Sequence, residues 1–394
     1  MRRAGSTAVA VAGGAVLGVF ALRRLVFMAA ALVPVRGADS GHRPESFAVV
    51  VPARDEAATI ERTLSYLAAA HAPAETYSVT LVDDGSTDGT AEIMEAFAAG
   101  RTGWSVVRLA GAGKAGALNA GLAASPRSEL VATCDADVRL DPGSLVELAA
   151  AFADPEVAAA SGLLWPGNDT ATTVARYCSL ELWQTQLVTS AAKERLGLNP
   201  PALGWLSCYR RHALDAIDGF REGSVGEDVE ASNALTAGGW RTRFVAGATV
   251  RGDVPERLGD YYHQHVRWGR AAHGSFSSGL GSGPAGGLRR VETWMLAAGY
   301  FDRVALAGLL AVAAMRRTVP ALPIAYLAVA GAEALVSLHL AGVRGARMGG
   351  FVAATIAMFP ADVATAAVGS AGALAGRRTR WRSPRRLRGG LPPR

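Results

Sequence analysis

The chain has 394 residues, of which 50% are hydrophobic and 19% are charged, and its formal net charge is +6 at pH 7. This composition is too apolar for an ordinary soluble enzyme, and the length suits one large domain with additions or two domains. The arginines gather beside apolar runs at both ends of the chain, which favours contact with anionic lipid. The middle of the chain has no basic stripe with interleaved aromatic residues, which argues against nucleic acid as a partner.

Residues 1–36 are predicted to form an N-terminal membrane anchor. The apolar run Ser6–Leu22 is followed by Arg23-Arg24 and a second apolar run, Leu25–Val35. The first run alone is short for a membrane span. A cleaved signal peptide is the competing interpretation, because basic residues precede the run and small residues follow it. The uncleaved anchor is favoured because the chemistry inferred below needs cytosolic substrates, and residues 37–46 then form a polar linker.

Strands and helices alternate through the next part of the chain. The predicted strands are Phe47–Pro52, Ser78–Val82, Trp104–Leu109, Leu130–Cys134 and Val157–Ser161, and the predicted helices between them are 57–70, 91–99, 115–124 and 142–152. This alternation predicts an α/β fold with a mostly parallel sheet and helices on both faces. Ligands bind at the carboxyl ends of the strands in such sheets.

Acidic residues stand where two of these strands end. Asp135 and Asp137 directly follow a buried strand, although aspartate is a poor strand residue. Two nearby carboxylates with a phosphate would suit a hard divalent cation. An ordinary turn with a helix cap explains the pair equally well when it is taken alone. Asp84 and Lys114 lie at or just beyond the ends of other strands, and this convergence favours a site.

The second half of the predicted domain carries four further segments. Thr172–Leu196 has the pattern of a helix that is either buried or on the membrane surface. Gly204–Cys208 is interpreted as a buried edge strand before two arginines. Glu227-Asp228 opens a helix, where the helix dipole alone would explain the acids. Tyr261–Gly274 is predicted to be a helix whose histidines, His263 and His265, are surface or packing residues rather than metal ligands. The cysteines are widely spaced and are expected to be buried thiols.

The C-terminal third is again apolar. Trp294–Met315 is interrupted by Asp302-Arg303 and is expected either to lie in the membrane interface or to cross it. Val319–Val343 and Phe351–Ala375 are long enough to cross, although each contains one acid, Glu333 or Asp362. Such acids mark function or face a protein-lined interior.

Six short motifs in order resemble those of family-2 glycosyltransferases with the GT-A fold, and in particular the membrane synthases of cellulose, hyaluronan and poly-N-acetylglucosamine. The resemblance covers about 49–274. The motifs are Val51-Pro-Ala-Arg-Asp-Glu56, Asp83-Asp-Gly-Ser86, Gly113-Lys-Ala-Gly116 with Asn119, Asp135-Ala-Asp137, Gly226-Glu-Asp228 and Gln264-His-Val-Arg-Trp268. The implied organisation is an anchor (1–36), a linker (37–46), a catalytic domain (47–275), interfacial and transmembrane helices (276–376) and a basic cytosolic tail (377–394).

The resemblance also implies a role for individual residues. Asp228 would be the general base and Asp137 the ligand of Mg²⁺ or Mn²⁺. The nucleotide sugar would be held by Ala53, Arg54, Glu56, Asp84, Lys114, Asp135 and Arg267. The acceptor would be held by Trp205, Ser207, Cys208, Gln264 and Trp268. Two positions depart from the usual motifs, because Gly226 stands where threonine is common and Ala112 where histidine is common. These departures weaken any inference about which sugar or acceptor is used.

The implied function is inverting transfer of a sugar from a nucleotide sugar, with UDP as the expected nucleotide, to a saccharide or lipid-linked acceptor. The expected location is the cytoplasmic face of the cell membrane in a multi-pass protein. Processive synthesis with export of a polysaccharide is favoured over transfer of a single sugar to a lipid or small acceptor. A catalytically silent membrane scaffold is the alternative from another class. The presence of Asp137, Asp228 and Arg267 argues against it.

Overall fold

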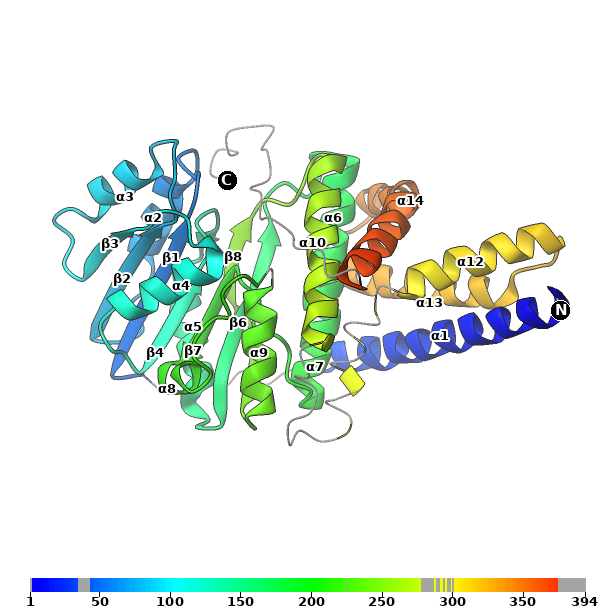
Figure 1. The fold of residues 1–394 in the computed structure, drawn as a ribbon, viewed down its shortest axis with the longest axis horizontal. Coiled ribbons are helices and arrows are strands. Elements are labelled where there is room, and N and C mark those ends of the chain that lie inside the picture. Colours follow the sequence, from blue (N-terminus) through cyan, green and yellow to red (C-terminus); the bar gives the residue numbers. More distant parts are fainter. Residues whose placement is uncertain are drawn as a thin grey trace.

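The computed structural model describes residues 2–34, 43–224, 226–277, 287, 291, 292, 295, 299 and 301–374. Its centre is an eight-stranded sheet with the order β3-β2-β1-β4-β7-β6-β8-β5 (Figure 1). The strands are β1 Ser46–Ala53, β2 Thr76–Asp83, β3 Trp104–Arg108, β4 Leu130–Cys134, β5 Arg139–Leu140, β6 Val157–Pro166, β7 Leu206–Arg210 and β8 Arg241–Gly252.

The sheet is mixed, with most strands running in one direction. β1 lies parallel to β2 and β4, β2 is parallel to β3, and β6 is parallel to β8. β7 is antiparallel to both β4 and β6, and β5 is antiparallel to β8. The predicted α/β fold with a mostly parallel sheet is therefore confirmed.

Helices cover both faces of the sheet. They are α2 Ile60–Ala69, α3 Thr90–Ala98, α4 Gly113–Ala124, α5 Ser144–Ala150, α6 Thr173–Trp183, α7 Ala191–Leu196, α8 Arg211–Asp215, α9 Glu227–Ala237 and α10 Leu258–Ser277. Val49 and Val51 of β1 face a core shared with α2, α3 and α5, whereas Ala48 and Val50 face a second core shared with α4, α8 and α9. Both sides of the strand are buried, which explains its continuous apolar sequence.

The short elements β5 and α8 were not predicted, and three longer segments also differ from the prediction. β7 lies inside the sheet between β4 and β6, so the interpretation of Gly204–Cys208 as an edge strand was wrong. β8 was not predicted, because arginines alternate with its buried residues and weaken the apolar signal. The helix expected over Thr172–Leu196 contains a π-helical segment, Gln184–Ser190. There the buried side chain of Gln186 bonds to the backbone N–H and C=O of Leu164 in β6, which fixes the helix to the sheet.

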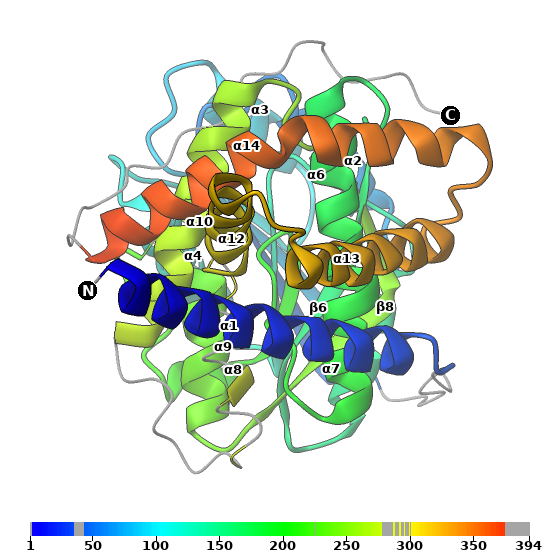
Figure 2. The same ribbon diagram turned by 90° about the vertical axis from the view of Figure 1, so that its right-hand side faces the viewer.

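A group of long helices packs beside the domain (Figure 1). They are α1 Arg2–Ala31, α12 Phe301–Arg316, α13 Ala321–Leu340 and α14 Ala346–Leu374. In the described part of the chain three helical stretches are long and apolar enough to cross a membrane, Ala12–Ala31, Ala321–Leu340 and Ala346–Gly372. Figure 2 shows α1, α13 and α14 side by side across one end of the molecule. α12 has 16 residues and is not among the candidate spans. The predicted tail 377–394, most of the linker and Trp294 lie outside the described residues.

The two arginines inside α1 pair with acids of other segments. Arg23 donates to both carboxylate oxygens of Glu292, at 2.8 Å from Nη2 to Oε2. Arg24 lies between Asp302 of α12 and Glu333 of α13 and forms an ion pair with each. These acids are buried. Removal of α1 would leave these acids without their arginine partners. The uncleaved anchor stays a prediction.

We expect Arg24→Met to destabilise the detergent-solubilised protein strongly. Breaking a buried ion pair by removing one partner costs about 3–5 kcal/mol, because the other charge stays buried. Thermal unfolding would measure the loss. Arg127→Met, at an exposed ion pair with Asp215, is the control and should change little. An Arg24→Met protein as stable as the wild type would contradict the inferred role of the pair.

Candidate active site

The loops after β1 and β2 are tied together at the carboxyl end of the sheet. The backbone N–H of Asp84 donates to the carbonyl of Ala53 at 2.8 Å. The buried carboxylate of Asp84 accepts from the backbone N–H groups of Ala112 and Gly113, and it lies 3.6 Å from Nη1 of Arg54. Three of the residues predicted to hold the nucleotide are thus adjacent. Asp84 also fixes the loop that precedes Lys114.

Glu56 lies in the loop between β1 and α2. Its backbone N–H donates to the hydroxyl of Thr90, and its carboxylate accepts from the hydroxyl of Thr59 at 2.8 Å. The side chain therefore lies between the loop after β1 and the first turn of α2. Its predicted role in nucleotide binding stays a prediction.

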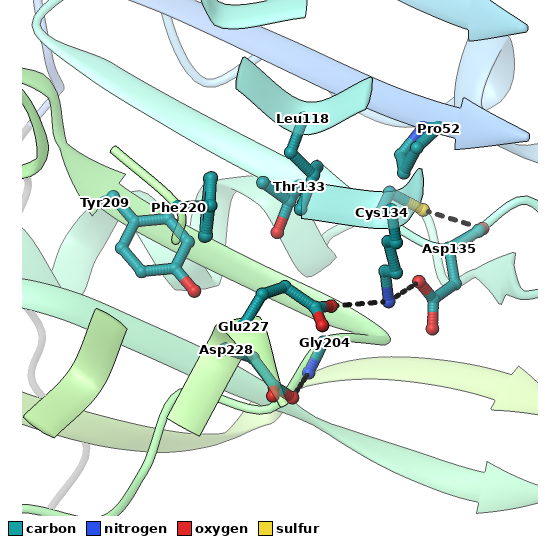
Figure 3. Close-up of a pocket in the computed structure, with 11 residues that line it drawn as sticks. Pro52, Leu118, Thr133, Cys134, Asp135, Gly204, Tyr209, Phe220, Glu227 and Asp228 are labelled. Atoms are coloured by element: carbon teal, nitrogen blue, oxygen red, sulfur yellow. Dashed lines mark hydrogen bonds and ion pairs between the residues drawn. The ribbon is translucent and has the colours of Figure 1, made fainter. Parts of the chain in front are cut away.

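Lys114 connects three elements in the middle of the site. Its Nζ atom lies 2.6 Å from Oδ1 of Asp135, at the end of β4, and 3.2 Å from Oε1 of Glu227, at the start of α9. Figure 3 shows Asp135 and Glu227 pointing toward each other, with Asp228 beside them. These residues line a pocket together with Pro52, Leu118, Thr133, Cys134, Gly204, Tyr209 and Phe220.

The close acids change one another's affinity for protons. Burial raises the pKa of Asp135 to about 6, with Lys114 opposing the shift and Asp137 adding to it. Burial and the neighbouring Glu227 raise the pKa of Asp228 above its usual range. Burial by itself would raise the pKa of Glu227, but Lys114, a backbone hydrogen bond and Arg267 together lower it. Burial alone would lower the pKa of Lys114, but the surrounding acids raise it, so the lysine remains charged.

Asp228 is held by the backbone at the start of α9. Its Oδ2 atom accepts from the N–H of Gly204 at 2.8 Å, and its Oδ1 atom accepts from the N–H of Val229 at 2.8 Å. A side chain at Gly204 would be crowded, because a Cβ atom there would lie 3.1 Å from Nζ of Lys114 and 3.2 Å from the Asp228 carboxylate. The backbone before β7 therefore forms one wall of the site.

The predicted cation ligands are carboxylates at the turn after β4. Asp137 is partly buried. Burial raises the pKa of the neighbouring thiol of Cys134, and the charges of Asp135 and Asp137 add to the shift. The described residues hold no cluster of three or more acidic, histidine or cysteine side chains that would enclose a metal. Mg²⁺ bound by one or two carboxylates and by substrate phosphates needs no such cluster. The two aspartates thus fit a cation that binds together with a diphosphate.

The predicted acceptor residues of β7 are placed differently from one another. Trp205 is partly exposed, and its Nε1–H donates to the carbonyl of Gly162 at 2.9 Å. Ser207 and Cys208 are fully buried, and the Ser207 hydroxyl donates to the carbonyl of Leu203. Neither of their side chains lines the pocket around Lys114. Gly204 and Tyr209, on either side of this stretch, do so instead.

The last motif lies on the helix α10, of which no described residue lines the pocket around Lys114. Gln264 and Arg267 are partly buried, and Trp268 is 38% exposed. The positive charge of Arg267 contributes to the lowered pKa of Glu227, so this arginine lies near the start of α9. A Cβ atom at Gly226 would lie 2.6 Å from Cβ of Ala271, one turn after Arg267. Glycine in place of the commoner threonine therefore permits close contact between α9 and α10.

Sequence reasoning did not assign Glu227, Gly204 or Tyr209 to the site. Glu227 belongs to a motif that was recognised, but its ion pair with Lys114 joins residues that are far apart in the sequence. Nothing in the sequence pointed to Gly204, because its place in the site depends on the small size of glycine. Tyr209 was hidden by its place in a buried strand.

Comparison with known proteins identifies relatives. Residues 44–271 match the sequence profile described as "Glycosyltransferase like family 2". An N-acetylglucosaminyltransferase of Mesorhizobium japonicum is 32% identical over 59% of this chain and 57% of its own length. One from Rhizobium meliloti is 29% identical over 57% of this chain and 54% of its own length. The chain thus matches a little over half the length of these curated relatives.

A solved structure is similar over nearly the whole chain. The mannosyltransferase of Pyrobaculum calidifontis, in complex with GDP-Man and Mn²⁺, superposes with a TM-score of 0.68 at 22% identity. The match covers 95% of this chain and 99% of that one. This similarity supports the GT-A fold.

We expect Gly226→Ala to destabilise the protein, although a glycine-to-alanine change without a clash usually stabilises by about 0.4–1 kcal/mol. The added methyl group would overlap Ala271, and overpacking costs about 1–3 kcal/mol. In a double-mutant cycle measured by thermal unfolding, Ala271→Gly should offset part of that loss. Gly259→Ala is the control, because a Cβ atom there meets nothing within 4 Å. Simple additivity of the two changes would show that they do not act through this contact.

Proposed function

The chain belongs to the glycosyltransferase family 2, and from this membership we propose that it transfers N-acetylglucosamine from a nucleotide sugar to a saccharide acceptor with inversion of configuration. UDP is the nucleotide we expect. The observation that carries the proposal is the cluster of Lys114, Asp135, Glu227 and Asp228 at the carboxyl edge of the sheet. The choice of sugar is supported by the curated relatives, which are named N-acetylglucosaminyltransferases.

The proposed reaction breaks the bond between the anomeric carbon and the diphosphate and forms one to the acceptor oxygen. The transition state has oxocarbenium character, and negative charge develops on the departing diphosphate. Asp228 would remove the proton from the acceptor hydroxyl, a role supported by its raised pKa and its fixed carboxylate. Lys114 and Arg267 would meet the charge of the diphosphate.

A divalent cation, Mg²⁺ or Mn²⁺, would be held by Asp137 and Asp135 and would neutralise charge on the diphosphate when bound. Ala53, Arg54, Glu56 and Asp84 would hold the nucleoside, because they surround the carboxyl ends of β1 and β2. Gln264 and Trp268 would contact the acceptor sugar, with the exposed indole ring offering a flat apolar face.

We also propose a multi-pass arrangement in the cell membrane with the catalytic domain on the cytoplasmic side. The three apolar stretches would cross the membrane, whereas the short α12 with Asp302-Arg303 would remain at the interface. After the domain, two crossings return the chain to the side on which the domain lies. The arginines of 377–394 would then be cytoplasmic, as the positive-inside rule prefers.

Incubation of membranes that contain the full-length protein with a panel of labelled nucleotide sugars would test the function. The panel should include UDP-N-acetylglucosamine, UDP-glucose and GDP-mannose, each with Mg²⁺, Mn²⁺ or a chelator. A ladder of products on a gel would show processive synthesis, and a single added sugar would show transfer to a lipid or small acceptor. Absence of transfer from every donor would favour the silent scaffold.

We expect Asp228→Asn to lower kcat by about 100-fold or more, an order typical of losing a general base. Binding of the nucleotide sugar should be retained, because asparagine preserves the size of the side chain. Turnover and the donor dissociation constant would be measured separately. Asp215→Asn, on the surface helix α8, is the control. Unchanged turnover in Asp228→Asn would remove this residue from the proposed role.

The pH profile should depend on Glu227. A general base acts in its deprotonated form, so kcat/KM should fall as pH drops through the raised pKa of Asp228. Replacing Glu227 by glutamine removes a neighbouring negative charge that raises this pKa. The acid limb of the profile should therefore move to lower pH. The exposed Glu92→Gln is the control, and an acid limb that stays in place or moves upward in Glu227→Gln would contradict the assignment.

A further inference from the structure

A chain of ion pairs connects α10 to three other helices. Nε2 of His265 lies 2.7 Å from Oε2 of Glu181 in α6. The other carboxylate oxygen of Glu181 lies 3.1 Å from Nη2 of Arg303 in α12. Nε of Arg303 lies 2.6 Å from Oδ2 of Asp362 in α14, and the hydroxyl of Tyr261, also in α10, donates to the same carboxylate. Asp362, which the sequence placed inside a span, therefore faces other protein groups.

His265 is closely packed by the groups around it. His265 is buried, stacks on the ring of Tyr261 at 3.9 Å between centroids, and has the ring of Trp268 at 5.0 Å. Its Nδ1 atom lies 2.9 Å from the backbone carbonyl oxygen of Tyr261. Both ring nitrogens thus lie within hydrogen-bond distance of an oxygen atom. The contact with Glu181 is an ion pair when the ring carries both protons.

Glu181 is held as an anion from both sides. Burial by itself would raise the pKa of this carboxyl group, but His265 and Arg303 hold it below its usual range. Removing either partner would leave this partly buried carboxylate with one counter-charge fewer, and its position would then be less well defined. The orientation of α10 at His265 depends on this carboxylate.

The opposite side of α10 faces the candidate active site. Arg267 follows His265 by two residues, which turns its side chain by about 200° around the helix axis. Its charge acts on Glu227, and the next turn, at Ala271, contacts Gly226. The helix is therefore fixed by the ion pairs on one side and contacts the start of α9 with the other. A rotation or shift that follows loss of the ion pairs would move Arg267 relative to Lys114.

We propose that Glu181 and His265 are positioning residues for sugar transfer. They hold α10 in the orientation that places Arg267 and Trp268. Their contacts with Arg303 and Asp362 make this orientation depend on α12 and α14. This inference rests on the proposed function, because misplacement of Arg267 and Trp268 is expected to impair donor binding and turnover. Neither Glu181 nor His265 belongs to the set of residues assigned to donor or acceptor contacts.

The test compares full-length variants in the same detergent or lipid nanodisc. We expect His265→Gln and Glu181→Gln each to lower kcat/KM for the nucleotide sugar by about 10-fold or more, since small misplacements of binding groups have large effects on rate. Both kcat and the donor KM should change, because a displaced Arg267 would contact the diphosphate less well in the bound donor and also in the transition state. The double variant should be little worse than the more impaired single variant, because both act through one contact.

Two further variants separate positioning from general stability. His265→Lys keeps a cation opposite Glu181 and should recover part of the activity that His265→Gln loses. Arg243→Gln breaks an ion pair of comparable burial, with Glu194 of α7, which includes no residue of α10. It should lower the thermal unfolding temperature without a comparable change in donor KM.

The outcomes distinguish this inference from the proposed function. If the wild type transfers sugar and His265→Gln and Glu181→Gln keep its kcat and KM, the positioning role is wrong. It is also wrong if Arg243→Gln changes donor KM as much as they do. If His265→Gln does not fold, the positioning role is tested with Glu181→Gln and His265→Lys instead. A folded but inactive His265→Lys protein with unchanged donor affinity would overturn the positioning role. If the wild type transfers no sugar from any donor, the proposed function fails, and with it the basis of the inference.

Discussion

The ammonium group of Lys114 holds together the parts of the candidate site that come from distant segments. Its partners, Asp135 and Glu227, belong to the first and second halves of the domain. A buried charge is costly unless it is paired, so these three groups stabilise one another only in the assembled fold. Burial raises the pKa values of Asp135 and Asp228, and the neighbouring carboxylates add to the shift. The cluster has more carboxylates than cations. Such an excess of negative charge suits the proposed binding of a divalent cation and a diphosphate.

Close backbone contacts determine how near the groups of the candidate site lie to one another. At Gly204 the backbone passes close to Lys114 and Asp228, so a side chain there would be crowded, and its N–H donates to the Asp228 carboxylate. At Gly226 the start of α9 meets Ala271 of α10. The unusual glycine in the Gly-Glu-Asp motif is therefore matched by the packing around it. This packing brings the Arg267 side of α10 close to Glu227.

The helices beside the domain are joined to it through buried charges as well as apolar contacts. Arg23 and Arg24 of α1 pair with Glu292, Asp302 and Glu333, and Arg303 pairs with Glu181 and Asp362. Apolar contacts between helices are weakly directional, whereas ion pairs with short distances define how helices are rotated against each other. These pairs account for the acids in the apolar C-terminal segments. They also provide the physical link between those segments and α10.

The sequence by itself determined the class of fold, the family and most of the groups that meet at the site. It did so because strand–helix alternation has a strong apolar pattern and because the motifs are continuous stretches such as Asp135-Ala-Asp137 and Gly226-Glu-Asp228. It did not predict β8, the interior position of β7 or the π-helical segment at Gln186, since these depend on pairing between distant segments. The partners of Lys114, the wall formed by Gly204 and the pairing of His265 with Glu181 were decided by the tertiary structure. Each is a contact between residues far apart in the chain, and the energy of such a contact exists only once the chain is folded.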